Sequence, residues 1–461
     1  MMKTNNNAVS KAIVAVVLII IITSAIAAIS INIIASKQYY KQTKMLVATN
    51  AITSNAHRPQ AIQKEGLTFM IYESMENGDS YIQCYDYRTN NITQPYIVDT
   101  LRMFSPDMHW SPAISIINDK LIAFVFGDGI NCKLSQYTIT EIKQNKTRLQ
   151  YWQDKTTYTY NPQIGMINYY QIFPFDNERK IAVIYSIQSG ETTWWRTEYN
   201  ETTWQQPIKI FSYIPDRFYM FVTEAKEKLL LTGYETRAVM GGRGENIYFS
   251  WSDNYGTTWK KVNGTQFDLP MNTSAKIFNS PVSTLPLPCI LDEYDRPTIH
   301  CLCYNSSQYH RYDESNPVYL LGDYNIKIVY YTAKLGQSGE WKIDFAKDEQ
   351  DNLLIMTYCD YVDPYLGLTE GKPTFWMRLK TPNGEYYMTR CVRMANNINH
   401  YMTFEDTYTD LTGSTDFPVL CGCSSVAIMN RDKASGFEVF CSEYYNGTWN
   451  CFLRGTNFAN N

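Results

Sequence analysis

Short runs rich in Tyr, Trp, Thr, Ile and Val recur along this chain in one order, separated by turns rich in Gly, Asn, Asp and Pro. The first set of residues favours extended strands and the second favours tight turns. Most copies end in a polar turn that a tryptophan closes, at residues 190–194, 256–259, 339–341 and 446–449. No convincing amphipathic helix longer than about two turns interrupts the pattern, which predicts an all-β protein.

The repeat has a period of roughly 50 residues and three or four strands per unit, which is typical of the blades of a β-propeller. The six units begin near residues 110, 161, 218, 280, 353 and 417. The sequence therefore predicts a six-bladed propeller. Residues 66–100 look like two further strands that would pair with the C-terminal unit, closing the ring and leaving no long open edge.

Residues 12–35 are almost wholly apolar and carry no charge. A helix of this length spans a hydrocarbon core of roughly 30 Å. The rival interpretation is a cleavable signal peptide, since residues 25–27 have the small-x-small pattern of a cleavage site, but the run is longer than a usual signal core. We therefore expect a cytoplasmic tail at 1–11, a transmembrane helix at 12–35, a short stalk or linker at 36–65 and a propeller head at 66–461.

The lysines flanking the helix do not settle its orientation. Asn-x-Ser/Thr sequons occur only beyond the helix, which places the head outside the cell as a type II glycoprotein. The acceptor residues are Asn91, Asn145, Asn200, Asn263, Asn272, Asn305 and Asn446.

All eleven cysteines lie in the predicted head, which agrees with an oxidising compartment and favours disulfides, with one thiol left over by the odd count. The chain has five histidines, too few to favour a metal site over disulfides, and we expect no cofactor. A net charge of −4 provides no basic surface for nucleic acid.

Residues 252–259 read Ser-Asp-Asn-Tyr-Gly-Thr-Thr-Trp and closely resemble the Asp-box of sialidases, with Asn254 in the place of the aspartate. In that motif an Asx side chain bonds local backbone, a glycine takes a positive φ and a tryptophan packs between blades. The resemblance implies that Ser252, Asn254, Gly256 and Trp259 have structural roles, away from any catalytic centre. It also implies a sialidase-type propeller.

Other segments between about residues 108 and 360 resemble sialidases more loosely. Residues 110–124 follow the family's opening strands, but Trp110 stands where the family has its first arginine. After the Ser-Asn-Pro segment at 315–317, the third arginine of the family is replaced around residues 323–325. By this resemblance, two of the three arginines that would bind a sugar carboxylate are missing.

The remaining catalytic roles carry over by resemblance. Tyr358, at the end of residues 351–358, would be the nucleophile, Glu224 its base and Arg243 the surviving arginine, with Asp128 the nearest acid. Each also has a structural interpretation: Glu224 and Arg243 as solvated edge charges, Tyr358 as core packing and Asp128 as a turn residue. With two arginines missing, we expect a degenerate site and lean against enzymatic activity.

An N-terminal anchor, a short stalk and a glycosylated sialidase-like head together resemble the attachment glycoproteins of enveloped negative-strand RNA viruses, of the hemagglutinin-neuraminidase and neuraminidase type. The resemblance implies a virion-envelope and cell-surface protein that binds a host-cell receptor, either a sialoglycan or a protein. A homo-oligomer and a viral fusion protein are the implied partners.

Three alternatives stay open. The first is an active exo-α-sialidase. The second is a cell-surface or secreted propeller that binds an unrelated glycan or protein. An esterase is the third, because Gly78, Asp79 and Ser80 form the G-D-S of viral hemagglutinin-esterases, but the matching downstream histidine motif is absent and Asn77-Gly78 reads as a hairpin turn.

Overall fold

The computed structural model describes residues 40–53, 59–64, 66–86, 89–99, 112–118, 120–127, 131–138, 157–160, 166–188, 192–200, 202–213, 217–236, 244–279, 284–304, 322–358, 365–369, 372–380, 386–394, 398–405, 419–428, 439–445 and 448–458. The regular structure of these residues is strand, apart from one short 3-10 helix, η4 (Thr273–Ala275). The prediction of an all-β protein is confirmed. No helix within the described residues is long and apolar enough to cross a bilayer, and the predicted helix at 12–35 lies outside them.

Within the described residues, the strands form three sheets of four strands and two larger sheets, each of which divides into two groups, which makes seven groups. The first group contains β3 (Ala61–Lys64), β4 (Leu67–Ser74), β5 (Ser80–Asp86), β6 (Asn91–Ile92) and β7 (Tyr96–Asp99), with β2 (Ala51–Ile52) beside β4. The second contains β8 (Ala113–Ile117), β9 (Lys120–Gly127), β10 (Asn131–Thr138) and β11 (Thr157–Tyr160). The third contains β12 (Met166–Phe175), β13 (Lys180–Gln188), β14 (Thr192–Tyr199) and β15 (Ile208–Tyr213).

The fourth group contains β16 (Arg217–Ala225), β17 (Lys228–Thr236), β18 (Gly244–Ser252) and β19 (Lys276–Phe278). The fifth contains β20 (Thr284–Pro286), β21 (Ile290–Leu291), β22 (Pro297–Tyr304), β23 (Gly322–Tyr331), β24 (Trp341–Phe345) and β25 (Ile355–Tyr358). The sixth contains β26 (Tyr365–Thr369), β27 (Lys372–Lys380), β28 (Tyr386–Arg393) and β29 (Tyr401–Glu405). The seventh contains β30 (Val419–Ile428), β31 (Val439–Tyr445), β32 (Thr448–Phe458) and β1 (Tyr40–Thr49).

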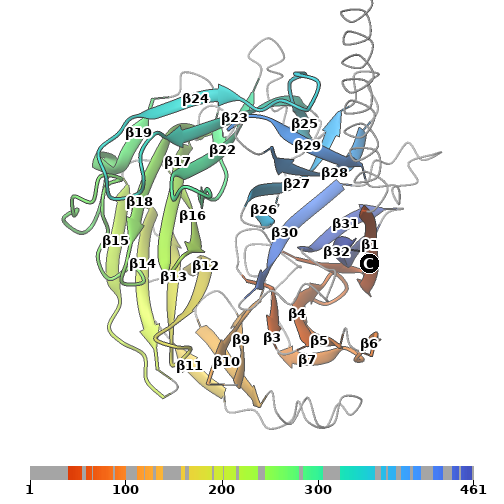
Figure 1. The fold of residues 1–461 in the computed structure, drawn as a ribbon. Coiled ribbons are helices and arrows are strands. Elements are labelled where there is room, and N and C mark those ends of the chain that lie inside the picture. Colours follow the sequence, from red (N-terminus) through yellow and green to blue (C-terminus); the bar gives the residue numbers. More distant parts are fainter. Residues whose placement is uncertain are drawn as a thin grey trace, which may run out of the picture.

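Weak links join the groups within the two larger sheets. The innermost strands β3 and β30 pair in parallel over three residues, whereas neighbouring strands within each group pair antiparallel. In the fifth group, β24 and β25 pair with successive parts of β23, so together they make its outer strand. A single residue pair, Met356 with Leu379, links β25 to the sixth group. The groups surround one axis as the blades of a β-propeller (Figure 1).

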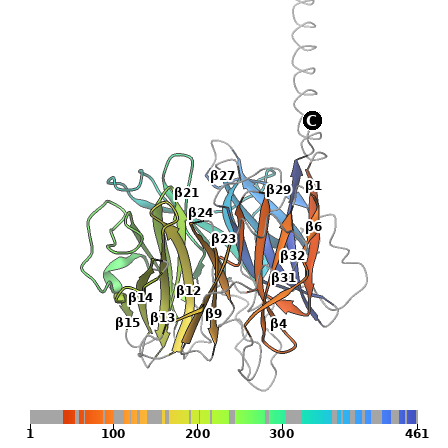
Figure 2. The same ribbon diagram turned by 90° about the horizontal axis from the view of Figure 1, so that it is seen from below.

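Seven groups replace the six blades predicted, and β1 explains the difference. Residues 66–100 were expected to complete the C-terminal unit, but β3 to β7 form a blade of their own. The C-terminal blade is closed instead by β1, which pairs with β32 along its whole length, from Tyr40 with Phe458 to Thr49 with Asn450. Figure 2 shows β1 and β32 side by side. The predicted stalk at 36–65 therefore contains strands of the propeller itself.

The core lies between blades. In β13 the residues from Ile181 to Ile187 are all buried, because neighbouring blades cover both faces of the sheet. On one side, Trp194, Phe211 and Tyr169 pack against Phe218 and other residues of the fourth blade in one hydrophobic cluster. This packing explains why the sequence shows continuous apolar runs rather than clean alternation.

The expectation of disulfides is wrong for four of the cysteines. Cys289, Cys301, Cys391 and Cys451 are free thiols, and all four are buried. Cys289 and Cys301 share one apolar cluster between the fourth and fifth blades, and burial raises their pKa values. These side chains act as small apolar core residues.

Candidate functional site

The propeller has two distinct ends, and contacts between turns identify them. Phe175, at the end of β12, stacks on Tyr255 of the turn after β18, with ring centroids 4.8 Å apart. Lys64, which ends β3, forms an ion pair of 2.6 Å with Glu178 of the turn after β12. The turns that follow the innermost strands therefore lie at the same end of the propeller as the turn at 252–259. We call this end of the propeller the Asp-box end, and the other one the opposite end.

The turn at 252–259 is held by its own side chains. Ser252 Oγ accepts hydrogen bonds from the N–H groups of Asn254 (3.2 Å) and Gly256 (2.8 Å). Asn254 Oδ1 accepts from Thr258 N at 2.9 Å, which is the role expected of the Asx residue. Gly256 has a φ of +85°, and the fully buried Trp259 donates through Nε1 to the Gly256 carbonyl at 3.1 Å. The substitution of Asn for Asp thus preserves an Asp-box turn.

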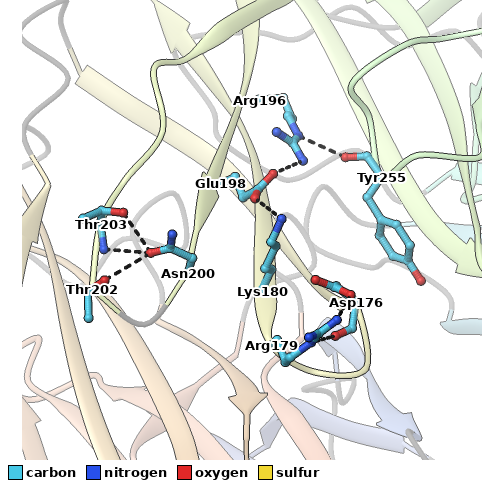
Figure 3. Close-up of polar contacts among 9 residues, drawn as sticks. All are labelled: Asp176, Arg179, Lys180, Arg196, Glu198, Asn200, Thr202, Thr203 and Tyr255. Carbon is cyan, nitrogen blue, oxygen red and sulfur yellow. Dashed lines mark hydrogen bonds and ion pairs between the residues drawn. The ribbon is translucent and has the colours of Figure 1, made fainter.

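A charged cluster ties this turn to the preceding blade (Figure 3). Arg196 of β14 donates through Nε to the Tyr255 carbonyl (3.1 Å) and through Nη2 to Glu198 (3.0 Å). Glu198 also forms an ion pair of 3.1 Å with Lys180. The Arg196 side chain is only 5% exposed, and desolvation lowers its pKa, although the contact with Glu198 opposes the shift. Every group in the cluster is bound to another group. The cluster therefore has a structural role, which is to connect two neighbouring blades.

Glu224 also belongs to the Asp-box end. It lies one residue before the end of β16, and its Oε1 accepts a hydrogen bond of 2.7 Å from the Tyr255 hydroxyl. The residue as a whole is exposed, yet the loss of water around its carboxyl raises the pKa, and nearby Glu227 adds to the rise. The hydrogen bond from Tyr255 acts in the other direction. The tyrosine in contact with this carboxyl is therefore Tyr255 of the Asp-box turn.

Tyr358 lies at the opposite end, so the structure does not bring together the nucleophile and base that the resemblance implies. Its backbone pairs with Gly322 at the start of β23, whereas Tyr331 ends β23 at the Asp-box end. The ten residues of β23 cover about 30 Å at roughly 3.3 Å per residue. The Tyr358 side chain, Arg243 and Asp128 lie outside the described residues.

A second polar cluster joins the fifth and sixth blades. Arg393, 2% exposed, forms ion pairs with Glu293 and with the fully buried Asp292, the latter at 3.5 Å. Nearby, His300 Nε2 and the Tyr401 hydroxyl are 2.7 Å apart. Burial lowers the pKa of His300 to about 3, so the imidazole is neutral at physiological pH. Among the residues whose side chains are placed, no group of three or more His, Cys, Asp or Glu side chains could hold a metal ion.

Four of the seven sequons fall within the described residues; Asn145, Asn305 and Asn446 lie outside them. Asn91, Asn263 and Asn272 are exposed and Asn200 is half-buried. All four lie on or beside connections between the third and fourth strands of a blade. The side-chain oxygens of Asn200, Asn263 and Asn272 accept backbone hydrogen bonds of 2.9 to 3.1 Å, which leaves the oxygen rather than the glycan-bearing nitrogen engaged.

Sequence reasoning did not single out Arg196, Glu198 or Lys180. A usable signal was present, because Arg196 follows two tryptophans within a strand whose other residues are mostly buried. A buried arginine requires partners, so its position predicts an ion-pair network. The sequence could not identify the carbonyl that Arg196 binds, because that carbonyl belongs to the next blade.

No protein-family model and no curated protein matches this chain. Among solved structures, it is similar to an ulvan lyase of polysaccharide lyase family PL25, bound to a glucuronate–sulfated rhamnose oligosaccharide. That match has a TM-score of 0.65 and 14% identity, and covers 90% of this chain and 96% of the other. The polysaccharide lyase Uly1 matches with a TM-score of 0.55 and 10% identity, covering 90% and 99%.

At these identities the similarity shows the fold alone: the chain has a propeller fold that it shares with carbohydrate-processing proteins. A subtype N11 neuraminidase-like protein from a flat-faced bat isolate also matches, over 76% of this chain and 92% of its own, with 10% identity. The TM-score of that match is 0.35.

Proposed function

We propose that this protein is a membrane-anchored glycoprotein whose propeller binds a carbohydrate-bearing receptor on a host cell, as a viral attachment protein does. The observation that carries the proposal is the separation of Glu224 and Tyr358 at opposite ends of a complete propeller. A propeller that keeps its ring but does not assemble this pair is suited to holding a glycan rather than hydrolysing a sialoside. The fold shared with polysaccharide lyases supports a carbohydrate as the ligand.

The anchor at 12–35, the sequons and the extracellular location form part of the same proposal. Tyr40, the first residue that the structure describes, lies at the Asp-box end, because β32 runs toward that end and Phe458 pairs with Tyr40. A head anchored there directs its opposite end away from the membrane, toward a second cell.

The test uses the full chain displayed on cells. Binding to erythrocytes and cultured cells, with and without enzymatic removal of surface glycans, is measured beside turnover of a fluorogenic sialoside. We expect glycan-dependent binding and no turnover. Turnover that Tyr358→Phe abolishes would support the alternative, an active exo-α-sialidase, and would overturn the proposal.

A second candidate function is cleavage of an acidic polysaccharide, favoured by the similarity to an ulvan lyase over 90% of the chain. Such a lyase removes the C5 proton of a uronate and breaks the glycosidic bond at C4, which leaves a C4–C5 double bond on one product and a protonated hydroxyl on the other. Incubation of the full chain with uronate-rich polysaccharides, followed by ultraviolet absorbance, distinguishes the two: rising absorbance would mean cleavage, and binding without it would mean recognition.

A further inference from the structure

The outer strand of the fifth blade, β24, has an open edge. It pairs with β23 in unbroken register, from Tyr331 with Trp341 to Lys327 with Phe345, and no strand of the described residues pairs with its other side. It lies on the outer rim of the ring (Figure 1). Trp341 is half-buried and the four residues after it are exposed, among them Ile343 at 38% and Phe345 at 37%. Two apolar side chains therefore reach solvent beside an open strand edge.

Alternate residues of β24 direct their backbone groups to the open edge. The Ala346 N–H donates to the Ile326 carbonyl at 2.9 Å, which fixes the alternation of hydrogen bonds along the antiparallel pair. The even-numbered residues of β24 therefore bond β23, and the odd-numbered residues direct their N–H and C=O groups outward. The outward N–H of Phe345 donates to Asp344 Oδ1 at 2.8 Å. That side chain takes the place that the carbonyl of a partner strand would occupy.

Three other outer strands are covered or irregular. In the third blade, Met271 exchanges backbone hydrogen bonds of 2.8 and 3.0 Å with the edge of β15. In the sixth, the Tyr401 N–H of β29 donates to the Lys347 carbonyl at 2.9 Å. In the seventh, β1 has a register shift between Leu46 and Ala48. Covering segments and bulges are ways in which sheet proteins prevent pairing between edges. Among the described residues, β24 has neither protection.

The sequence of β24 is complementary to itself in one antiparallel register. If Ile343 lies opposite Ile343 of a second copy, Lys342 lies opposite Asp344 twice and Trp341 lies opposite Phe345 twice. The odd-numbered residues then exchange backbone hydrogen bonds, and the charged pairs occupy the positions where side chains are closest. Opposite charges at such positions stabilise a sheet. The two neighbouring registers would instead place Lys342 opposite Lys342, or Asp344 opposite Asp344.

We propose that β24 pairs with β24 of a second copy of this chain, so that two fifth blades form one continuous sheet. A two-fold interface uses the same surface on both partners, which the self-complementary register of β24 provides. Five residues a side make a small interface, so we expect weak pairing in dilute solution that strengthens when both copies share a membrane. The pairing does not depend on the proposed function.

The twist of the blade places both copies the same way up. Adjacent strands rotate by about 20–25°, so the outer strand of a blade lies roughly 60–75° from its innermost strand. Figure 1 accordingly shows β24 running along the rim of the ring. A two-fold axis perpendicular to the sheet at β24 is therefore close to the propeller axis. The two Asp-box ends, each with its Tyr40, then lie on the same side.

The test is oxidative cross-linking of full-length protein in the membranes of expressing cells. In the proposed register the Cα atoms of residue 343 in the two copies lie about 5.5 Å apart, within the range of a disulfide. Ile343→Cys should form a covalent dimer on a nonreducing gel. Leu46→Cys is the matched control, because Leu46 is also exposed on an outer strand. Wild type measures the background from native cysteines. We expect Ile343→Cys to cross-link at least ~5-fold more than the control.

Charge reversal tests the register itself. Added to Ile343→Cys, Asp344→Lys turns two attractive pairs into two repulsive ones, which should lower cross-linking about tenfold. The double exchange Lys342→Asp/Asp344→Lys restores opposite charges and should restore cross-linking. Both residues are exposed, so each variant should keep the unfolding temperature of wild type within a few degrees. If Ile343→Cys fails to fold, sedimentation of the charge variants in detergent at high protein concentration decides.

Three results would overturn the proposal. One is equal cross-linking at positions 343 and 46, and another is cross-linking that Asp344→Lys leaves unchanged. The third is a cross-link from position 343 to a different protein, which would make β24 the docking edge for another chain. Binding of the wild-type protein to cells is measured separately, so each of these results would leave the proposed function standing.

Discussion

The Tyr255 hydroxyl donates a 2.7 Å hydrogen bond to Glu224 Oε1, joining the Asp-box turn to the end of the innermost strand of the same blade. Both groups have raised pKa values, for Tyr255 chiefly because of desolvation and then because of the carboxyl that it contacts. The carboxyl that the resemblance makes a catalytic base is thus bonded to Tyr255 and lies at the other end of the propeller from Tyr358. The pair therefore gives Glu224 a structural role that can be tested by substitution.

Glu224→Gln should stabilise the protein slightly at neutral pH. Since the pKa of Glu224 is raised above its ordinary 4.5, folding favours the protonated carboxyl, and the charged form costs stability as pH rises. Glutamine removes the charge and keeps an oxygen for Tyr255. Thermal unfolding from pH 3 to 8 should show equal stability at low pH and a gain for the variant above 4.5. A loss that grows with pH would contradict this prediction.

Arg196→Met should destabilise the protein by about 2–4 kcal/mol, because it leaves Glu198 and the Tyr255 carbonyl without their buried cationic donor. The matched control is Lys180→Met. That lysine contacts the same carboxylate but is 37% exposed, and such pairs contribute no more than about 1 kcal/mol. Urea unfolding measures both. Similar losses of stability for the two variants would show that the buried Arg196 contributes no more than Lys180, and would contradict this prediction.

Two neighbouring residues of β1 test whether the chain after the predicted anchor is a stalk or a blade strand. Val47 is 9% exposed within a hydrophobic cluster, and Leu46 is 50% exposed. Val47→Asp should cost on the order of 3 kcal/mol, since it buries a charge, whereas Leu46→Asp should stay within about 0.5 kcal/mol. A stalk would tolerate both substitutions equally in urea unfolding.

His300 should make the protein acid-sensitive. Its pKa is lowered to about 3 by burial, while an unfolded chain binds the proton near pH 6.5. Stability should therefore fall as pH drops from 6.5 toward 3, by up to about 1.4 kcal/mol per pH unit. His300→Gln, which can still bond Tyr401, should reduce that slope. An unchanged slope in denaturant titrations at several pH values would exclude His300 as its source.

A glycan placed at the opposite end should block attachment to cells. Asp79→Thr converts Asn77-Gly78-Asp79 into a sequon in the turn between β4 and β5, where Asn77 is exposed. β3 runs toward the Asp-box end and β4 runs back, so this turn lies at the opposite end. The control is Thr265→Ala, which removes the sequon at Asn263 on the Asp-box side. Cell binding should fall for the first variant only, with the added glycan verified by a mass shift.

Several features could be read from the sequence because they depend on residues close together in the chain. Strand-forming composition and turn residues predicted an all-β protein, and the eight residues 252–259 contain the donors and acceptors of their own turn. Asn254 replaces aspartate without loss because the motif needs a side-chain oxygen, which both residues supply.

Only the tertiary structure decided which distant segments meet. The pairing of Tyr40 with Phe458 completes the C-terminal blade, so β3 to β7 form a blade of their own, and no local pattern encodes that register. The same holds for the positions of Glu224 and Tyr358, whose separation follows from the direction of each strand within its blade. Cysteine counts predicted disulfides, but packing between blades buried Cys289, Cys301, Cys391 and Cys451 as thiols. The sequence determined strands and turns through contacts between near neighbours, while ring closure through long-range pairing determined how many blades there are and which side chains share an end.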